Sequence, residues 1–367
     1  MQVNASSFWS RLEQHPDVRW LPVPLPTTDD RPHVGIFAKR DIAVGERILY
    51  NAALAVVPTA QHCWYCLHPL GPSDLACSGC TARYCSPECR IQHKPQHRAA
   101  CGRRLSPEAD LLVQAAGAPQ LPLTAARSGR PLCLRADWAC LMALLPRGEP
   151  TPAGEAAAAV GADPIEVLQA SRRLHNHFGI SDECLTTRGG GVFPFGALLN
   201  HSCVANTAAF YVLRRGRRPV QCFVALTPIA RFAELTHNYC DLVQARERRW
   251  EALGFQCGCT RCRAPWAAER LLVEDPSAQE GLAAIAEAEA LPPAARMARL
   301  AALRCASPLA ERQRWIRLVP LLIAAGRVAD ARVAAQYVFS IDSRFYAYPT
   351  HPSLVFQRAC LKLAAPQ

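Results

Sequence analysis

The stretch that decides the first part of the fold runs from residue 63 to residue 101 and reads CWYCLHPLGPSDLACSGCTARYCSPECRIQHKPQHRAAC. It holds four close pairs of metal-ligand candidates: Cys63 with Cys66, Cys77 with Cys80, Cys85 with Cys89, and His97 with Cys101. Pairs at these spacings supply two tetrahedral zinc shells that leave no position for water, so both zincs are expected to be structural. A stretch this short and this poor in apolar side chains cannot bury a core, and metal ligation must supply much of its folding free energy.

We predict that the pairs alternate between the two ions. Alternate pairing ties both ends of a small module together, whereas sequential pairing would leave two separate loops. One zinc would then take Cys63, Cys66, Cys85 and Cys89, and the other Cys77, Cys80, His97 and Cys101. The competing interpretation of these cysteines is a disulfide knot, which needs an oxidising compartment and a signal peptide.

The composition of the whole chain favours a soluble protein of two or three domains. The chain has 367 residues, of which 50% are hydrophobic, enough for a sizeable core. No apolar run is long enough to span a membrane, and the N-terminal residues mix both charge signs without the apolar segment of a signal peptide. We therefore expect a reducing compartment, which suits zinc-bound thiolates among the 18 cysteines.

The net charge of +11 favours acidic or phosphate-bearing partners. Arginine carries nearly all of the positive charge, because the lysines are Lys39, Lys94 and Lys362. A compositional bias towards arginine, alanine, proline and glycine explains the charge at least as well as selection for contact with nucleic acid. Binding of nucleic acid is therefore expected to be weak or absent.

Short strands are predicted on both sides of a helical region. The strands are expected over residues 31–38, 47–57, 208–214, 220–226 and 234–239. The helices are expected after the Ser106-Pro107 cap, over 138–145, from Asp163 to about Asn176, and from about Ser277 onward. Residues 146–161 are typical of a loop, and the run Gly189-Gly190-Gly191 indicates a break that ends the helical region.

Residues 315–340 have the spacing of a helical hairpin around Gly326. This spacing resembles a tetratricopeptide-type repeat, but an ordinary helical pair explains it equally well.

A third cysteine cluster, Cys257-x-Cys259-x2-Cys262, contains three ligands and needs a fourth from elsewhere. Cys203 is the best candidate because it lies in the polar motif NHSC, which follows an apolar run. An iron–sulfur cluster is the alternative for such a ligand set. A zinc on these four cysteines would attach the segment after residue 250 to the loop that begins at Asn200, and would bring together parts that are distant in sequence.

Two motifs in the second half of the chain carry a family resemblance. Residues 196–206 read GALLNHSCVAN, and residues 234–239 read ELTHNY. With the CxCxxC tail, they resemble the SET domain of protein lysine methyltransferases. The stretch 63–101 looks like a MYND finger, and a MYND finger inserted into a SET domain resembles the SMYD family. The resemblance covers about residues 31–262. Residues 351–352, together with 361–363, look like the end of that family's helical C-terminal domain.

The resemblance implies an α+β fold. Its parts are a SET-type β-fold of short strands with an inserted zinc-binding MYND finger, a zinc-stapled post-SET segment and an all-α, tetratricopeptide-like C-terminal domain. The implied boundaries are the N-terminal part of the SET domain at 1–62, the finger at 63–101, a helical insertion at 102–190, the core SET domain at 191–250, the post-SET segment at 251–265 and the helical domain at 266–367.

The resemblance also implies an enzyme, a protein-lysine N-methyltransferase that uses S-adenosylmethionine and holds three structural zinc ions. Methyl transfer is an in-line displacement that needs alignment and a neutral amine, and a narrow apolar channel would favour the neutral amine by desolvating the ammonium. Tyr239 is the expected catalytic residue, and Phe178 and Phe193 are the expected walls of the lysine channel. The residues expected to bind the cofactor are His33, Val34, Gly35, Asn176, His177, Asn200, His201 and Phe255.

The sequence departs from the family pattern at five residues. They are Leu253 in place of a tyrosine, His33 in place of the first glycine of the cofactor turn, Ala205 in place of a proline, and Phe232-Ala233 in place of a glycine turn. Of these, Leu253 and Phe232 motivate an alternative function, a MYND-mediated adaptor or transcriptional co-regulator whose SET domain is catalytically weak. The intact NHSC and ELTHNY motifs favour the enzyme.

The expected partners are a protein substrate, through a histone or non-histone lysine, and a proline-rich peptide at the finger. A DNA-binding zinc finger is a third interpretation, but the stretch lacks the basic recognition helix of such fingers. The protein is expected to be a monomer without membrane association, in the cytoplasm and the nucleus.

Overall fold

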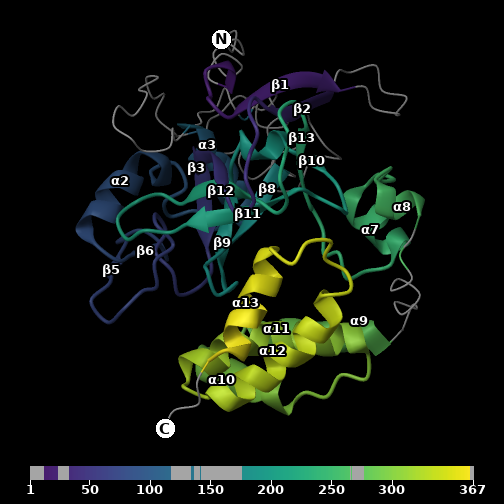
Figure 1. Ribbon diagram of the computed structural model, residues 1–367. Coiled ribbons are helices and arrows are strands. Elements are labelled where there is room, and N and C mark those ends of the chain that lie inside the picture. The colour runs from purple at the N-terminus through teal and green to yellow at the C-terminus, as the bar shows by residue number, and fades with distance from the viewer. Residues whose placement is uncertain are drawn as a thin grey trace. The chain divides into compact units, whose positions relative to one another are not determined.

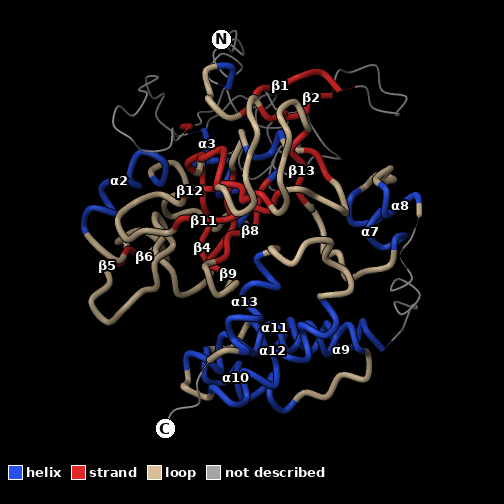
Figure 2. Tube along the Cα trace, viewed as in Figure 1, coloured by secondary structure: helices blue, strands red, loops and turns tan. Residues whose placement is uncertain are grey.

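The computed structural model describes residues 12–23, 33–116, 134–135, 141, 176–264, 266 and 277–363. The chain divides into two compact units whose segments interleave along the sequence. The first unit is Met1–Asp182, Thr187–Asn200 and Ala209–Leu235, and the second is Glu183–Thr186, His201–Ala208 and Thr236–Gln367. Small sheets and helices together confirm the predicted α+β class (Figure 1 and Figure 2).

The described strands form four small sheets. The first sheet contains β1 (Val18–Val23), β2 (His33–Ala38), β13 (Glu234–His237) and β10 (Asn200–His201). The second contains β11 (Thr207–Val212), β12 (Val220–Ala225), β3 (Arg47–Ala52) and β7 (Leu134–Arg135). The third contains β4 (Ala55–Pro58), β9 (Thr187–Val192) and β8 (His177–Ser181), and the fourth pairs β5 (Leu75–Ala76) with β6 (Arg83–Tyr84).

The strands predicted from the sequence are confirmed at five places, and β1 was not predicted. β1 pairs antiparallel with β2 from Val18 opposite Ala38 to Val23 opposite His33. β12 runs antiparallel to β3, and β7 runs parallel to it. Buried aliphatic and aromatic side chains from these strands form the main core of the first unit, to which Ile36, Ile48 and Phe223 belong.

The glycines at 189–191 form the middle strand of a sheet, so the predicted helical insertion is wrong over residues 177–190. β9 lies between β4 and β8, with antiparallel pairing on both sides. A Cβ on Gly189 would meet the carbonyl oxygen of Val57 at 2.2 Å, and one on Gly191 would meet Ile180 at 2.8 Å. Glycine is therefore needed here for close approach of the neighbouring strand, not to end a helix.

The described part of the first unit also contains two longer helices and a short 3-10 helix, η2 (Gly196–Leu198). α2 (Pro87–His97) lies within the 63–101 stretch, and α3 (Pro107–Ala116) follows it. The predicted cap is confirmed, because Ser106 Oγ accepts the backbone N–H of Ala109 at 3.2 Å. The helices predicted over 138–145 and 163–176 and the loop predicted over 146–161 lie outside the described residues, apart from Leu141, which is helical, and Asn176, which directly precedes β8.

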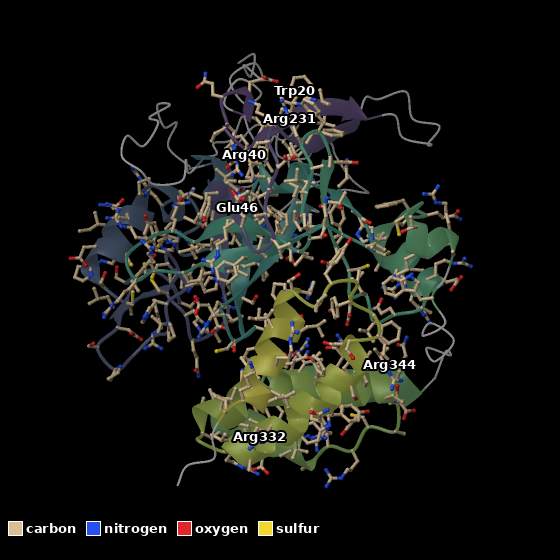
Figure 3. The ribbon with its side chains drawn as sticks, in the orientation of Figure 1. Trp20, Arg40, Glu46, Arg231, Arg332 and Arg344 are labelled. Carbon is tan, nitrogen blue, oxygen red and sulfur yellow. The ribbon has the colours of Figure 1, made fainter. Side chains whose placement is uncertain are left out.

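An exposed arginine joins two turns of the first unit. Arg40, just after β2, pairs with Asp17 at 2.7 Å and with Glu46, which precedes β3 (Figure 3). Glu46 also accepts the backbone N–H of Ala43 at 3.1 Å, which closes the turn between the two strands.

The second unit is helical in its described part. Its helices are α7 (Arg246–Leu253), α8 (Thr260–Arg263), α9 (Ser277–Glu289), α10 (Pro293–Ala302), α11 (Pro308–Ala324), α12 (Val328–Asp342) and α13 (Pro352–Leu361). α11 and α12 form the predicted helical hairpin, and Gly326 makes the turn between them with φ of 71°. Buried Ala331, Ala334 and Ala335 present small side chains that let α12 pack closely into this core.

A buried ion network also holds the second unit together. Arg312, on α11, is 2% exposed and donates to Asp342 at 2.5 Å and to Asp241 at 2.7 Å. Gln357 donates to the other oxygen of Asp342 at 2.7 Å. The guanidinium therefore connects the segment that follows Tyr239 to the C-terminal helices of the same unit.

No helix among the described residues has the length and apolar character that a membrane crossing requires. The predicted domain boundaries, the SET-type assignment and the tetratricopeptide-like assignment stay predictions.

Candidate functional site

The first metal centre of the 63–101 stretch gathers four buried sulfur atoms, those of Cys63, Cys66, Cys85 and Cys89. The Sγ atom of Cys66 lies 3.5 Å from that of Cys85 and 3.8 Å from that of Cys89. Zinc with Zn–S bonds of about 2.3 Å places tetrahedral sulfur ligands about 3.8 Å apart, so these sulfurs fit one ion. A disulfide would need about 2.0 Å, and the cysteines are free.

The second centre combines Cys77, Cys80, His97 and Cys101, whose ligand atoms lie within 4.8 Å of one another. Cys77 Sγ is 3.5 Å from Cys101 Sγ, and Cys80 Sγ is 3.4 Å from His97 Nε2. The alternate pairing predicted from the sequence is therefore confirmed. The ligand sets, one of four cysteines and one of three cysteines and a histidine, are those of structural zinc.

The local chain geometry brings these ligands together. The β5–β6 hairpin pairs Leu75 with Tyr84, so the second cysteine pair lies in its loop and the third pair begins directly after its second strand. Gly79 lies so close to the second centre that a Cβ there would be 3.0 Å from Cys101 Sγ. Ser86 Oγ accepts the backbone N–H of Cys89 at 3.3 Å, which starts α2 with Cys89 in its first turn.

A cavity of about 250 Å³ lies beside the second centre. Trp64, His97 and Asp110 line it, together with the exposed Arg103 and Arg104. Burial raises the pKa of Asp110 to about 6. The cavity therefore offers an indole ring, a buried carboxyl group and two guanidinium groups. A peptide bound there could contact each of these groups.

The third centre joins Cys203 to Cys257, Cys259 and Cys262, as predicted. Cys203 Sγ lies 3.6 Å from Cys262 Sγ, close to the spacing expected around one zinc ion. α8 begins directly after Cys259, and the backbone N–H of Cys262 donates to the carbonyl oxygen of Cys259 at 3.1 Å. This tight turn brings the sulfur atoms of Cys259 and Cys262 to the same metal centre.

The side chain of Asn200 connects β10 to two other segments of the first unit, at Val34 and at Glu234. Its Nδ2 donates to the carbonyl oxygen of Val34 at 3.2 Å and to Glu234 Oε1 at 2.8 Å. Asn200 thus contacts the β2 segment that was predicted to approach the cofactor, where Gly35 is buried. Glu234 was not predicted as a site residue.

His201 joins three segments within the second unit. Its Nδ1 accepts the backbone N–H of Tyr239 at 3.0 Å, and its Nε2 lies 3.3 Å from Cys203 Sγ. The ring centroid of His201 lies 5.3 Å from that of Tyr239 and 6.2 Å from that of Phe255. Residues predicted for cofactor binding and catalysis, from three separate motifs, are therefore in contact.

The remaining predicted residues lie elsewhere in their units. Phe178 and Phe193 meet edge to face with ring centroids 6.0 Å apart. Phe193 is fully buried and packs against Ile180 and Tyr211 in an apolar cluster. Asn176 is half-buried and His177 is exposed, and His33 begins β2. The channel role of both phenylalanines and the cofactor roles of these three residues stay predictions.

The altered turn before Glu234 contains a strained phenylalanine. Phe232 has φ of 71° and a side chain that is 51% exposed. The guanidinium carbons of Arg19 and Arg231 lie 4.6 Å and 4.4 Å from its ring centroid. Each such contact is worth about 0.5–1 kcal/mol at an exposed site, which offsets a left-handed conformation that costs about 1–2 kcal/mol.

Arg249 lies at the third centre and was not predicted from the sequence. It is fully buried in α7, and its Nη2 lies 3.8 Å from Cys262 Sγ at the third centre. One arginine among several in a polar helix produces no periodic pattern, so the sequence RERRWEAL gave no signal that distinguishes it from Arg248. Leu253, at the end of the same helix, packs against the third-centre cluster.

Comparison with known families matches residues 63–101 to the MYND finger. The match covers the first two metal centres and agrees with their geometry, so the chain carries a MYND zinc finger. No curated protein matches the chain. A MYND finger is consistent with the SMYD resemblance and with a protein-binding role.

Proposed function

We propose that the protein is an S-adenosylmethionine-dependent protein-lysine N-methyltransferase of SET type that also carries a MYND finger for protein partners. The contact of His201 with Tyr239 and Phe255 carries this proposal. It joins the NHSC motif, the ELTHNY motif and the segment before the third zinc centre in the combination that the SET resemblance requires.

The bound cofactor would supply the methyl group from its sulfonium sulfur, which would leave as a neutral thioether. The ring nitrogens of His201 already have neighbours within the second unit, at 3.0 Å and 3.3 Å, so His201 would serve the cofactor through its backbone groups. Asn200 uses its Nδ2 on Val34 and Glu234, which leaves its side-chain oxygen as the acceptor for a ligand. Phe255, 39% exposed, would cover the adenine ring.

Tyr239 would place its hydroxyl beside the lysine amine and orient its lone pair for in-line attack. Its backbone N–H is held by His201, so the position of the residue does not depend on the hydroxyl group. A positioned hydrogen-bonding group of this kind, here accepting from the amine N–H, acts mainly where charge develops in the transition state.

The test combines cofactor binding with methyl transfer. S-adenosylmethionine should raise the melting temperature of the zinc-loaded protein, because a ligand that binds only the folded state stabilises it by mass action. Asn200→Ala should remove most of the shift. Arg332→Ala, which changes an exposed side chain on α12, should keep it (Figure 3). Labelled methyl groups should then appear on lysine in a mixed protein lysate.

An unchanged melting temperature at millimolar cofactor would sink the enzyme proposal. The second candidate, a protein-binding adaptor with a weak SET domain, is favoured by the MYND match and by the cavity at Trp64. It predicts binding of a labelled proline-rich peptide that Trp64→Ala weakens. Peptide binding together with absent methyl transfer would favour the adaptor over the enzyme.

A further inference from the structure

Helix α7 buries an arginine completely in the interior of its unit, and its apolar side chains only in part. Its sequence is RERRWEAL, and Arg249 is its one buried residue, with no exposed surface. Trp250 and Leu253 are partly buried against the third-centre cluster. Burial of a guanidinium is costly unless hydrogen bonds and negative charge compensate it, so the contacts of Arg249 bear on how well this helix docks.

The guanidinium reaches the metal centre directly. Its Nη1 donates to the carbonyl oxygen of Gln244 at 2.6 Å, and its Nη2 lies 3.8 Å from Cys262 Sγ. Four thiolates around Zn²⁺ leave a net charge of about −2, because the ion neutralises two of the four. The positive side chain thus faces the negative ligand set of the third centre. An N–H···S contact to a zinc-bound thiolate also satisfies a sulfur lone pair.

The finger offers a comparison within the same chain. Arg215 approaches the first finger centre, which also has four cysteines, through the carbonyl oxygen of Cys85 at 2.8 Å. That arginine is therefore bound to backbone, whereas Arg249 points at a ligand sulfur. A substitution of Arg249 is expected to act on one centre of the three.

We propose that Arg249 couples metal binding at the third centre to the docking of α7. With zinc bound, the thiolate charge holds the guanidinium and the helix. With zinc removed, the four sulfurs are no longer held together as one negative ligand set beside the guanidinium, and α7 detaches. Gly254 and Phe255 follow α7 directly, so Phe255 would leave the ring of His201, from which it lies 6.2 Å between centroids, when the metal leaves. Arg249 is in this sense a positioning residue, and the proposal holds for the enzyme and for the adaptor.

Hydrogen exchange of the full chain tests the coupling. Removal of zinc with a chelator should speed exchange of the α7 amides by at least about tenfold, since a detached helix of eight residues is not stable alone. Arg249→Met should produce the same increase without a chelator. Arg248→Met is the matched control, because Arg248 lies on the same helix and is exposed, with Glu251 as its partner at 2.9 Å. The α7 amides of the Arg248→Met variant should exchange at the wild-type rate.

Release of zinc to a chromophoric chelator gives a second measurement. Arg249→Met should release one zinc of three at least about tenfold faster than the wild type, while the two finger zincs leave at the wild-type rate. Arg249→Lys keeps the charge and should release this zinc at close to the wild-type rate. Wild-type exchange of α7 in Arg249→Met would overturn the proposal. So would equal acceleration of all three zincs, because that result indicates general unfolding rather than a local coupling.

Discussion

His201 contacts three neighbours at once, so a substitution of His201 would not test any one of these contacts alone. Its two ring nitrogens meet the backbone of Tyr239 and the sulfur of Cys203, and its ring lies against Phe255. Loss of the imidazole would disturb the third zinc centre and the Tyr239 segment together. Variants that change one atom at a neighbouring residue therefore test the proposed chemistry more cleanly.

Tyr239→Phe should lower methyl-transfer turnover by about ten- to a thousandfold, the contribution of one positioned hydrogen-bonding group. The ring and the backbone N–H remain, so cofactor affinity and the contact with His201 should change little. The measurement is single-turnover transfer beside calorimetric cofactor titration. Tyr348→Phe, in the segment between α12 and α13, is the control and should match the wild type. Equal turnover in the Tyr239 and Tyr348 variants would remove Tyr239 from the catalytic site.

The structure of β9 shows how one element depends on glycine at particular positions. Gly189 and Gly191 lie where a Cβ would collide with a neighbouring strand, whereas a Cβ on Gly190 would be 3.7 Å from the carbonyl oxygen of Phe178. The three positions are consecutive in one strand and differ mainly in the space beside them.

Gly189→Ala should lower the free energy of unfolding by about 1–3 kcal/mol or more, because the new methyl group would press on the backbone at Val57, 2.2 Å away. Gly190→Ala is the matched control in the same strand and should change it by less than about 1 kcal/mol. Urea unfolding of both zinc-loaded variants makes the comparison. Equal midpoints would contradict the close packing of β4 against β9.

α13 begins with a histidine that can cap the helix only in its neutral form. His351 Nδ1 accepts the backbone N–H of Ser353 at 3.3 Å, and the ring stacks on Tyr346 with centroids 4.1 Å apart. Burial lowers the pKa of His351 from 6.5 to about 4, against the opposing charge of Asp241. The folded state therefore resists protonation of this ring more than the unfolded state does.

The sign of the pH effect follows from that difference. The contribution of neutral His351 to the free energy of unfolding is complete above pH 6.5. It is lost as the pH falls from 6.5 towards 4, because the unfolded chain binds the proton first. The full effect is about 3 kcal/mol, since one pKa unit corresponds to about 1.4 kcal/mol. His351→Asn should keep a cap and show a weaker loss of melting temperature over this range. An identical pH profile for both proteins would contradict the assignment.

Ligand spacing made the metal centres predictable, whereas the packing around them was not. Zinc fixes both the number and the distance of its ligands, so paired cysteines identified the finger sets, and an incomplete triad indicated Cys203. Arg249 and Glu234 gave no such signal, because their roles depend on which side of α7 or β13 faces the interior. The glycines of β9 were misinterpreted for a related reason, since close approach of β4 cannot be seen in a local pattern.

At the scale of the whole molecule, metal is distributed over both units. The first unit contains the two finger centres, and the second contains the third centre. Each zinc replaces part of the apolar core that a short segment lacks. Chelation should therefore affect both units, although through different centres.

Metal analysis of the purified protein should give three zinc ions per chain. Cys203→Ser should give two, because a three-cysteine shell holds the ion more weakly than a complete one. The finger zincs should remain, since their eight ligands are untouched. Two zincs in the wild type would rule out the third centre, and a loss of all three in Cys203→Ser would show that the centres are not independent.

The interleaving of the two units also sets the order in which the protein can fold on the ribosome. The chain passes between the units after residues 182, 186, 200, 208 and 235, so the first unit stays incomplete until β12 and the start of β13 have been synthesised. The finger is complete at Cys101. At about 5–20 residues per second, a nascent chain carries a finished finger for about 7–27 s before the rest of its unit can close. We expect zinc supplied during translation, rather than after release, to decide when the first ordered module forms.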